Sequence, residues 1–188
     1  MRVLVTGGAG FVGKELVRAL RDDVDLLVVD TLRYGTPDWL QHGPEGFEFR
    51  HADIRDVDAI TDVVTGFGPD VVVHLAAIHY IPECDADPAN AVATNVAGTV
   101  NLLAACPPGT RFVFASSGAV YKPDEAPHRE FDSEIEPADI YGITKLQGET
   151  YVRALTASRG FTGCIVRLFN VIGPGETNPH LLPALMDQ

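Results

Sequence analysis

The feature that most constrains the fold is the start of the chain, where a short apolar run leads into a cluster of glycines. Val3 to Val5 form the run, and glycines follow at positions 7, 8, 10 and 13. Apolar residues then recur at the spacing of one helix face, namely Val12, Leu16, Ala19 and Leu20. The sequence therefore predicts a strand, a tight turn and a helix, the opening unit of an α/β protein with a doubly wound, Rossmann-type parallel sheet in three layers.

The glycines fit two overlapping patterns, Gly8-x-Gly10-x-x-Gly13 and Gly7-x-x-Gly10-x-x-Gly13. One glycine allows turn angles that a Cβ forbids, one lets the backbone approach phosphates, and the last lets helix and strand pack closely. A pyrophosphate would then rest on the N-terminus of the helix, where free N–H groups favour an anion. Such turns also occur without a ligand, so the glycines indicate a dinucleotide site only together with the segments that follow them in the chain.

A second apolar run, Leu26 to Val29, ends in Asp30, which lies 17 residues after Gly13. A carboxylate near this spacing typically binds the ribose hydroxyls of a dinucleotide. Asp30 would repel a 2′-phosphate, so it favours NAD over NADP. Arg33 leaves the alternative open, because an arginine at this point can instead meet a 2′-phosphate.

The bulk properties exclude several classes of protein. The 188 residues are 46% hydrophobic, which is enough for one domain with a substantial core. The net charge of −12 argues against nucleic acid or an anionic membrane surface as a partner. The cysteines, Cys84, Cys106 and Cys164, are odd in number and have no paired spacing, as expected of reduced thiols in the cytoplasm. No long apolar run or signal pattern indicates a membrane segment or secretion.

A third strand is expected over residues 47–50, followed by Asp53 and Ile54. At a strand end, Asp53 can bond the amine of an adenine ring and Ile54 can pack on its face. Alternatively, Asp53 can cap the helix predicted from Asp56 to Phe67. On these residues alone, the cap is the better explanation.

The apolar run 71–75 predicts a buried parallel strand, and Ala76 and Ala77 after it leave room for a cofactor at the sheet edge. His74 and His79 have no partner at a metal-binding spacing, and the acids Glu83, Asp85 and Asp87 fall in a loop-like stretch. We therefore expect no metal site.

The apolar positions between residues 88 and 105 predict an amphipathic helix with a proline at its start. Asn95 is the polar exception on this helix. An amide there usually satisfies neighbouring backbone, although it can also orient a lysine through a water molecule.

A fifth strand, 111–115, delivers Ser116 and Ser117 to the edge of the sheet where ligands bind. Downstream, Tyr141 and Lys145 lie near the start of a helix expected to run to Ser158, and four residues place them on one face. A nearby ammonium, helped by a nicotinamide cation, would lower the pKa of the tyrosine so that it acts as a base. Such pairs also arise by chance, so the context again decides between the two interpretations.

In this order, the motifs resemble the extended short-chain dehydrogenase/reductases that act on nucleotide sugars, the NAD-dependent epimerase/dehydratase group. The resemblance covers essentially the whole chain. It depends on the glycine turn, Asp30, Asp53-Ile54 and five further segments, which are 74–77, 95–99, 116–121, 141–145 and 167–175.

The resemblance implies roles for individual residues. Tyr141 would be the base, Lys145 would bind the nicotinamide ribose, Ser117 would bond the reacting hydroxyl, and Asn170 would lie near the sugar diphosphate; Ser117, Tyr141 and Asn170 would thus bind substrate. The implied NAD contacts are Gly7, Gly10, Phe11, Val12, Gly13, Asp30, Thr31, Asp53, Ile54, Leu75, Ala76, Ala77, Asn95, Ala115, Ser116, Tyr141, Lys145 and Leu168. The family also commonly forms homodimers through two helices that match residues 88–105 and 141–158.

Within the family, 4,6-dehydratases tend to carry an Asp-Glu pair after the active hydroxyl, where this chain has Gly118 and Ala119. This difference favours epimerisation of a UDP-sugar at C4 through a 4-keto intermediate. The alternatives are a dehydratase, decarboxylase or reductase of the same family, and a non-catalytic NAD(H)-binding module. We expect residues 1–170 to form the NAD-binding domain and 171–188, with Pro174, Pro179 and Pro183, to begin a substrate lobe that is truncated or missing here.

Overall fold

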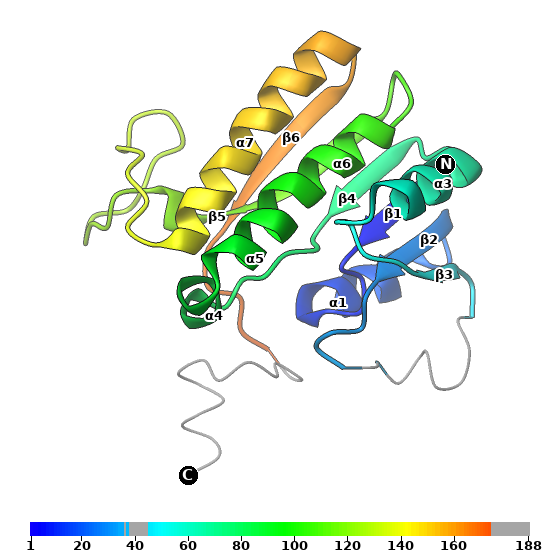
Figure 1. Cartoon of the computed structure of the whole chain (residues 1–188), viewed down its shortest axis with the longest axis horizontal. Helices are drawn as coiled ribbons and strands as arrows, with labels where there is room; N and C mark the ends of the chain where they lie inside the picture. The colour runs from blue at the N-terminus through cyan, green and yellow to red at the C-terminus, as the bar shows by residue number, and fades with distance from the viewer. Residues whose placement is uncertain (36, 38–44, 174–188) are drawn as a thin grey trace.

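The computed structural model describes residues 1–35, 37 and 45–173. Its centre is a parallel sheet of six strands in the order β3-β2-β1-β4-β5-β6 (Figure 1). The strands are β1 (Arg2–Thr6), β2 (Asp25–Asp30), β3 (Glu48–His51), β4 (Val71–His74), β5 (Arg111–Ser117) and β6 (Thr162–Leu168). This is the strand order of a doubly wound sheet, as the sequence predicts.

The strand order reverses between β1 and β4, which pair in register from Val3↔Val71 to Thr6↔His74. The chain leaves β1 on one side to build β2 and β3, and later leaves β4 on the other side to build β5 and β6. The connections therefore diverge at the carboxyl ends of β1 and β4, and a crevice opens there.

Helices cover both faces of the sheet. Leu4 of β1 packs with Phe112 and Phe114 of β5 beneath α3, α6 and α7, which lie across the near face in Figure 1. Val3 and Val5 point to the opposite face, where Val17 of α1 covers them. This alternation along a strand gives the three layers that the sequence predicts. The helices are α1 (Phe11–Leu20), α3 (Val57–Phe67), α4 (Ile81–Ala86), α5 (Pro88–Val92), α6 (Gly98–Ala105) and α7 (Ile140–Arg159).

Local signals explain where the main helices begin and end. Asp56 caps α3 by accepting a hydrogen bond from Ala59 N, and Asp139 caps α7 by accepting one from Gly142 N. Both helices end at a glycine with a positive φ, of 63° at Gly68 and 73° at Gly160, which is the usual C-terminal signal.

Two expectations about elements need correction. Glu83 and Asp85 lie in the short helix α4, not in a loop, because Pro82 sits in its first turn and starts it. The helix expected over 88–105 is interrupted between α5 and α6 by a π-helical turn, Ala93–Ala97. Such turns often mark functional positions.

Part of one expectation lies outside the described residues, namely residues 174–188 of the predicted substrate lobe. Among the residues that are described, no helix combines the length and the apolar character that spanning a membrane requires.

Candidate active site

A cleft of about 990 Å³ runs along the carboxyl ends of the strands. Of the residues that the sequence assigns to cofactor or substrate, all but Asn95 line it. Their lining positions come from the glycine turn, the ends of β2, β4, β5 and β6, the segment after β3, and the first turns of α7. The predicted residues thus meet in one place, although their individual roles stay predictions.

The glycine turn has the shape that a phosphate cradle needs. Gly7 has a φ of +73°, and a Cβ there would lie 2.6 Å from Ala76 N. A Cβ at Gly13 would lie 2.2 Å from Gly7 O, so Gly13 is required for packing within the turn. At Gly10, by contrast, the nearest atom to an added Cβ is Gly7 O at 3.3 Å, and Gly10 faces the cleft. The turn therefore fits a dinucleotide pyrophosphate that approaches the backbone at Gly10.

Asp30 is fixed by backbone groups at the mouth of the cleft. Its Oδ2 accepts a hydrogen bond from Ala9 N at 2.9 Å, and its Oδ1 accepts one from Leu32 N at 2.7 Å. These contacts join the glycine turn to the loop after β2, where Leu32 has a φ of 58°. The carboxylate keeps further acceptor capacity for ribose hydroxyls.

Arg33 lines the cleft, but its positive charge is paired with a carboxylate. Its Nη2 makes an ion pair with Oε1 of Glu83 on α4, and the Tyr34 hydroxyl donates to Oε2 of the same carboxylate at 3.1 Å. Burial, and then the Glu83 charge, raise the pKa of Tyr34 to about 12. With Arg33 paired, the interpretation of this arginine as a 2′-phosphate ligand loses support, and NAD remains the better fit.

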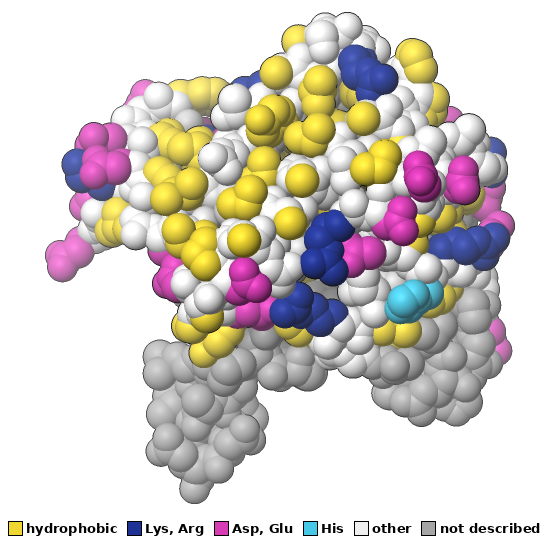
Figure 2. All heavy atoms as spheres, viewed as in Figure 1, with side chains coloured by type: hydrophobic (Ala, Val, Ile, Leu, Met, Phe, Trp, Pro, Cys, Tyr) yellow, Lys and Arg dark blue, Asp and Glu magenta, His cyan; other side chains and the backbone are white. Residues whose placement is uncertain are grey.

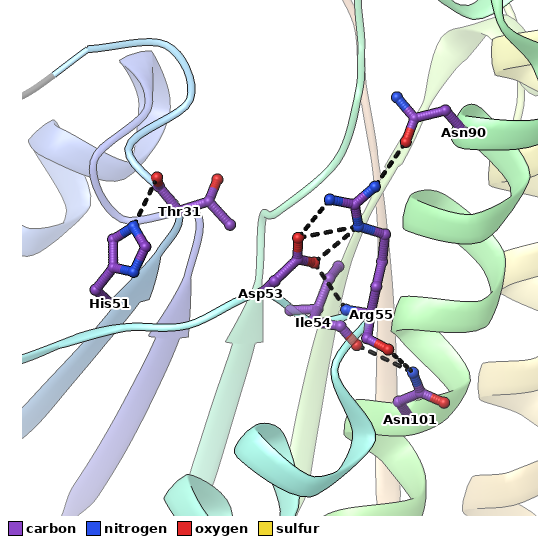
Figure 3. A network of polar contacts seen from close by, with 7 residues as sticks. All are labelled: Thr31, His51, Asp53, Ile54, Arg55, Asn90 and Asn101. Carbon is purple, nitrogen blue, oxygen red and sulfur yellow. Dashed lines mark hydrogen bonds and ion pairs between the residues drawn. The ribbon is translucent and has the colours of Figure 1, made fainter.

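Thr31, Asp53 and Ile54, which line the end of the cleft where the sequence predicts an adenosine, are drawn in Figure 3. His51 and the Thr31 carbonyl are in hydrogen-bond contact at 3.1 Å, which ties the end of β3 to the loop after β2. The suggestion that Asp53 caps the next helix is wrong, because Asp56 is that cap. Asp53 instead accepts hydrogen bonds from Arg55, and the hydrogen bond from the Arg55 side chain is the main cause that lowers the pKa of Asp53.

Ile54 lines the cleft but is only 4% exposed. A Cβ at Gly98 of α6 would lie 2.6 Å from its Cδ1, so the side chain fills the space that this glycine leaves. Most of the Ile54 side chain is therefore committed to the core, and only a small part can face a base.

Tyr141 and Lys145 lie one turn apart at the start of α7, on the cleft side. Lys145 is 3% exposed; its Nζ donates to Ala115 O at 2.8 Å and lies 5.8 Å from the centre of the Tyr141 ring. Burial lowers the pKa of Lys145 to about 8. The two side chains therefore lie close together, as predicted, beside Ala115 near the carboxyl end of β5.

The predicted lowering of the tyrosine pKa depends on a nicotinamide cation as well as on Lys145, so it stays a prediction for the NAD-bound site. Burial raises the pKa of Tyr141 to about 12, and a hydrogen bond from Ser117 offsets only part of that effect. A buried phenol resists ionisation because the phenolate loses its hydration. A lowered pKa of Tyr141 would therefore require the ammonium of Lys145 and a bound cation to outweigh this desolvation.

The two serines at the end of β5 have different partners. Ser117 contacts Tyr141, and its Oγ also accepts from Ala119 N at 3.1 Å. Ser116 also lines the cleft, but its hydroxyl donates to Glu149 at 2.6 Å. This hydroxyl is therefore used in a contact between β5 and α7. Of the two serines, Ser117 is thus the one whose hydroxyl contacts the predicted base, Tyr141.

Asn95 does not line the cleft, because its amide is used inside the protein. Its Oδ1 accepts from Ile78 N and its Nδ2 donates to Ile78 O, both at 2.8 Å. The structure therefore shows the first of the two roles considered for this amide, the satisfaction of neighbouring backbone. The expected direct contact between Asn95 and the cofactor finds no support in this geometry.

Asn95 also belongs to a buried chain of hydrogen bonds that ends at Tyr141. Thr99 donates to Asn95 O at 2.7 Å, so it must accept from Nε2 of His74, while Thr6 donates to Nδ1 at 2.6 Å. On the other side, Asn95 Nδ2 donates to Thr144, which donates to Tyr141 O. Burial, and then the Lys145 charge, lower the pKa of His74 to about 3, so this histidine stays neutral.

The sequence reasoning missed three residues around the site. Glu149 lies one turn after Lys145 on α7 and is fully buried, and a charge on the inner face of that helix was the available signal. Arg55 lines the cleft beside Asp53, and its spacing from Asp53 gave no sign of the contact between their side chains. Phe169 lines the other end beside Asn170 and packs over Gly118, where a Cβ would lie 2.7 Å from its ring.

Comparison with known proteins places this geometry in context. The sequence model that describes the NAD dependent epimerase/dehydratase family matches residues 3–188 of this chain. A UDP-glucose 4-epimerase of Mycolicibacterium smegmatis is 37% identical over 187 residues, which are 96% of this chain and 59% of that protein. A dTDP-glucose 4,6-dehydratase of Streptomyces niveus is 34% identical over 198 residues, 97% of this chain and 57% of that protein.

Among solved structures, the UDP-glucose 4-epimerase of Thermus thermophilus in complex with NAD superimposes with a TM-score of 0.85 at 32% identity. The match covers 96% of this chain and 58% of that one. The chain thus spans a little under three fifths of the length of these relatives.

Proposed function

We infer, from the fact that this chain belongs to the NAD dependent epimerase/dehydratase family, that its cleft binds NAD and that it takes part in the 4-epimerisation of a UDP-sugar. The cofactor fits the residues present. The turn at Gly10 is open to a pyrophosphate, Asp30 is held where a ribose would lie, and Asp53 lines the far end. The NAD complex of the Thermus thermophilus relative supports the same assignment.

The chemistry that NAD would supply is to accept a hydride from C4 of the sugar and later to return it. Tyr141 accepts the proton of the C4 hydroxyl, which becomes a carbonyl. It gives the proton back after the bound 4-keto sugar has rotated to present its opposite face. Ser117 bonds the same oxygen and holds it near the phenol. The Lys145 ammonium, one turn away, is the chain's own group that favours the phenolate.

The observation that carries epimerisation over dehydration is the surface next to Ser117. Elimination of water from the sugar needs an additional acid and base, and this chain offers Gly118 and Ala119 at that place. A side chain at Gly118 would also collide with Phe169 at 2.7 Å. The wall of the cleft at this point is therefore apolar and suited to hydride transfer alone.

A dehydratase is the second candidate, because a dTDP-glucose 4,6-dehydratase is among the relatives at 34% identity. Incubation with UDP- and dTDP-sugars, with products identified by mass and NMR, separates the two. An unchanged mass with inversion at C4 supports the epimerase, whereas a stable 4-keto product supports the dehydratase. Binding of NAD without turnover of any sugar would favour the non-catalytic module.

The base is tested by Tyr141→Phe, which removes the hydroxyl and keeps the ring. Interconversion should cease while NAD affinity stays close to that of the wild type. Tyr151→Phe, on the exposed side of the same helix, is the matched control and should retain activity. Turnover retained in the Tyr141 variant would refute the proposed mechanism.

The proposal extends to assembly, domains and location. A homodimer through α5, α6 and α7 is supported by apolar side chains exposed on these helices, among them Val92 and Ile143, and hydrophobic atoms are visible over this face in Figure 2. Residues 1–170 would form the NAD-binding domain, and 171–188 would begin a substrate lobe. The unpaired cysteines support a cytoplasmic location.

A further inference from the structure

Arg55 connects two separate parts of the chain at the adenosine end of the cleft. Its Nε donates to the Asp53 carboxylate at 3.0 Å and its Nη2 at 2.5 Å, while its Nη1 donates to Asn90 Oδ1 at 2.8 Å (Figure 3). Asn90 lies in the first turn of α5, where its own N–H donates to the N-cap Asp87. The guanidinium therefore holds the Asp53 carboxylate against the start of a helix.

The backbone at this point is also fixed. Asn101 of α6 donates from Nδ2 to Ile54 O at 3.1 Å and contacts Arg55 O at 3.4 Å. Figure 3 shows Asn101 below Arg55 and Asn90 above it, so α5 and α6 hold this loop from two sides. Neither the main chain nor the carboxylate of Asp53 can turn without breaking these contacts.

The contacts leave Asp53 with limited acceptor capacity. A carboxylate has about four lone-pair sites. Three N–H groups of Arg55 donate to it: the backbone N–H to Oδ1, the Nη2–H to Oδ2, and the Nε–H to both oxygens at 3.0 Å each. Because the Nε–H is shared, three donors face about four acceptor sites. The side chain of Asp53 is 29% exposed and lines the cleft, so its remaining acceptor capacity is accessible to one further donor there.

We propose that Arg55, anchored by Asn90, is a positioning residue for base recognition: it aims the last acceptor site of Asp53 at the exocyclic amino group of adenine. The proposal depends on the NAD site inferred above. A base with a carbonyl oxygen at that position offers an acceptor to an acceptor and is rejected. The Arg55 hydrogen bond lowers the pKa of Asp53, so this carboxylate stays ionised and donates nothing at neutral pH.

The test compares two dinucleotides on the full chain by calorimetric titration. NAD+ carries the amino group, and nicotinamide hypoxanthine dinucleotide carries a carbonyl oxygen in its place. The wild type should prefer NAD+ by about tenfold, the effect of one hydrogen bond to a charged group. In Arg55→Lys, which keeps the charge but loses the fork, and in Asn90→Ala, this preference should fall toward equal binding.

The matched control is Arg50→Lys. Arg50 pairs with Glu48 at 3.0 Å across the same two-residue spacing, and it does not line the cleft. It should keep the wild-type preference. Asn90→Asp, which keeps an acceptor for the guanidinium, should recover the preference lost in Asn90→Ala, and this recovery separates positioning from a general loss of structure.

The outcomes distinguish this inference from the proposed function. A wild-type preference that persists in both Arg55→Lys and Asn90→Ala would overturn the role of Arg55. Equal binding of the two dinucleotides by the wild type would overturn it as well, while leaving the NAD site in place. A wild-type chain that binds neither dinucleotide would refute the cofactor assignment and this inference with it.

Discussion

Glu149 offers the sharpest test of how α7, the helix that carries Tyr141 and Lys145, is held to the sheet. The residue is 0% exposed on α7, and its carboxylate pairs with Arg167 of β6 through two contacts of 2.8 Å. It also accepts from Ser116 at 2.6 Å and from Arg153 at 2.9 Å. Glu149→Gln keeps the shape of the side chain but removes its charge, so Arg167 loses its counterion.

The size of the effect follows from burial. Removal of one partner of a buried ion pair costs about 3 to 5 kcal/mol. The Arg167 side chain is 14% exposed and keeps its contact with the Tyr121 ring at 4.6 Å, so we expect the lower end, about 3 kcal/mol. For a chain of this length, that loss lowers the melting temperature by roughly 6 to 12 °C.

The loss should depend on pH in a defined direction. Burial acts to raise the pKa of Glu149, but hydrogen bonds from Arg167 and Ser116 outweigh it and hold the pKa below the ordinary value of 4.5. A depressed pKa in the folded state contributes stability above the unfolded value, and this contribution disappears as the pH falls through the folded value. The difference between wild type and Glu149→Gln should therefore shrink below pH 4.5.

The assay is urea unfolding followed by circular dichroism, at neutral pH and in acid. Arg153→Ala is the control, because that arginine is 56% exposed and its pair with Glu149 should contribute no more than about 1 kcal/mol. A loss in Glu149→Gln no larger than that of the control would refute the reasoning, as would a difference that stays constant in acid.

Two further predictions concern the cofactor cleft. Gly13→Ala should lower the melting temperature strongly, because its Cβ would lie 2.2 Å from Gly7 O, whereas Gly10→Ala should melt near the wild type but lose NAD affinity; thermal unfolding with NAD titration checks both, and similar behaviour of the two variants would contradict the assigned roles. Glu83→Gln should release Arg33 and raise the affinity for NADP relative to NAD, whereas Glu134→Gln, which affects only the surface partner Lys122, should not. A selectivity ratio that is the same in both variants would show that the ion pair does not restrain Arg33.

The sequence was sufficient for the sheet and for the place of the site. Apolar runs such as Val71 to Val73 lie in the core or against it, and the residues after each run fall at the same edge because the strands are parallel. Local chemistry was thus enough to bring Asp30, Ser117 and Tyr141 to one cleft. The relatives confirm the family that this order of motifs resembles.

The missed features depend on neighbours that are distant in sequence. Whether Asp53 or Asp56 caps α3 is decided by the course of the backbone, and both are good capping residues. The pKa of Tyr141 rises because other segments of the chain exclude water from it, which spacing to Lys145 cannot reveal. Glu149 falls on the inner face of its helix, but its partner Arg167 comes from β6 and cannot be found from the helix alone.

The hydrogen bonds that run from Thr6 through His74 and Thr99 to Asn95 have a consequence for assembly. Each hydroxyl has a single hydrogen, so every donor in the series has one permitted direction. A slip of α6 by one residue against β4 would break the His74–Thr99 hydrogen bond and leave buried polar groups unpaired, at a cost for each unpaired group. The series therefore favours one alignment of helix and sheet, and compact states with another alignment are less stable even when no ligand is bound.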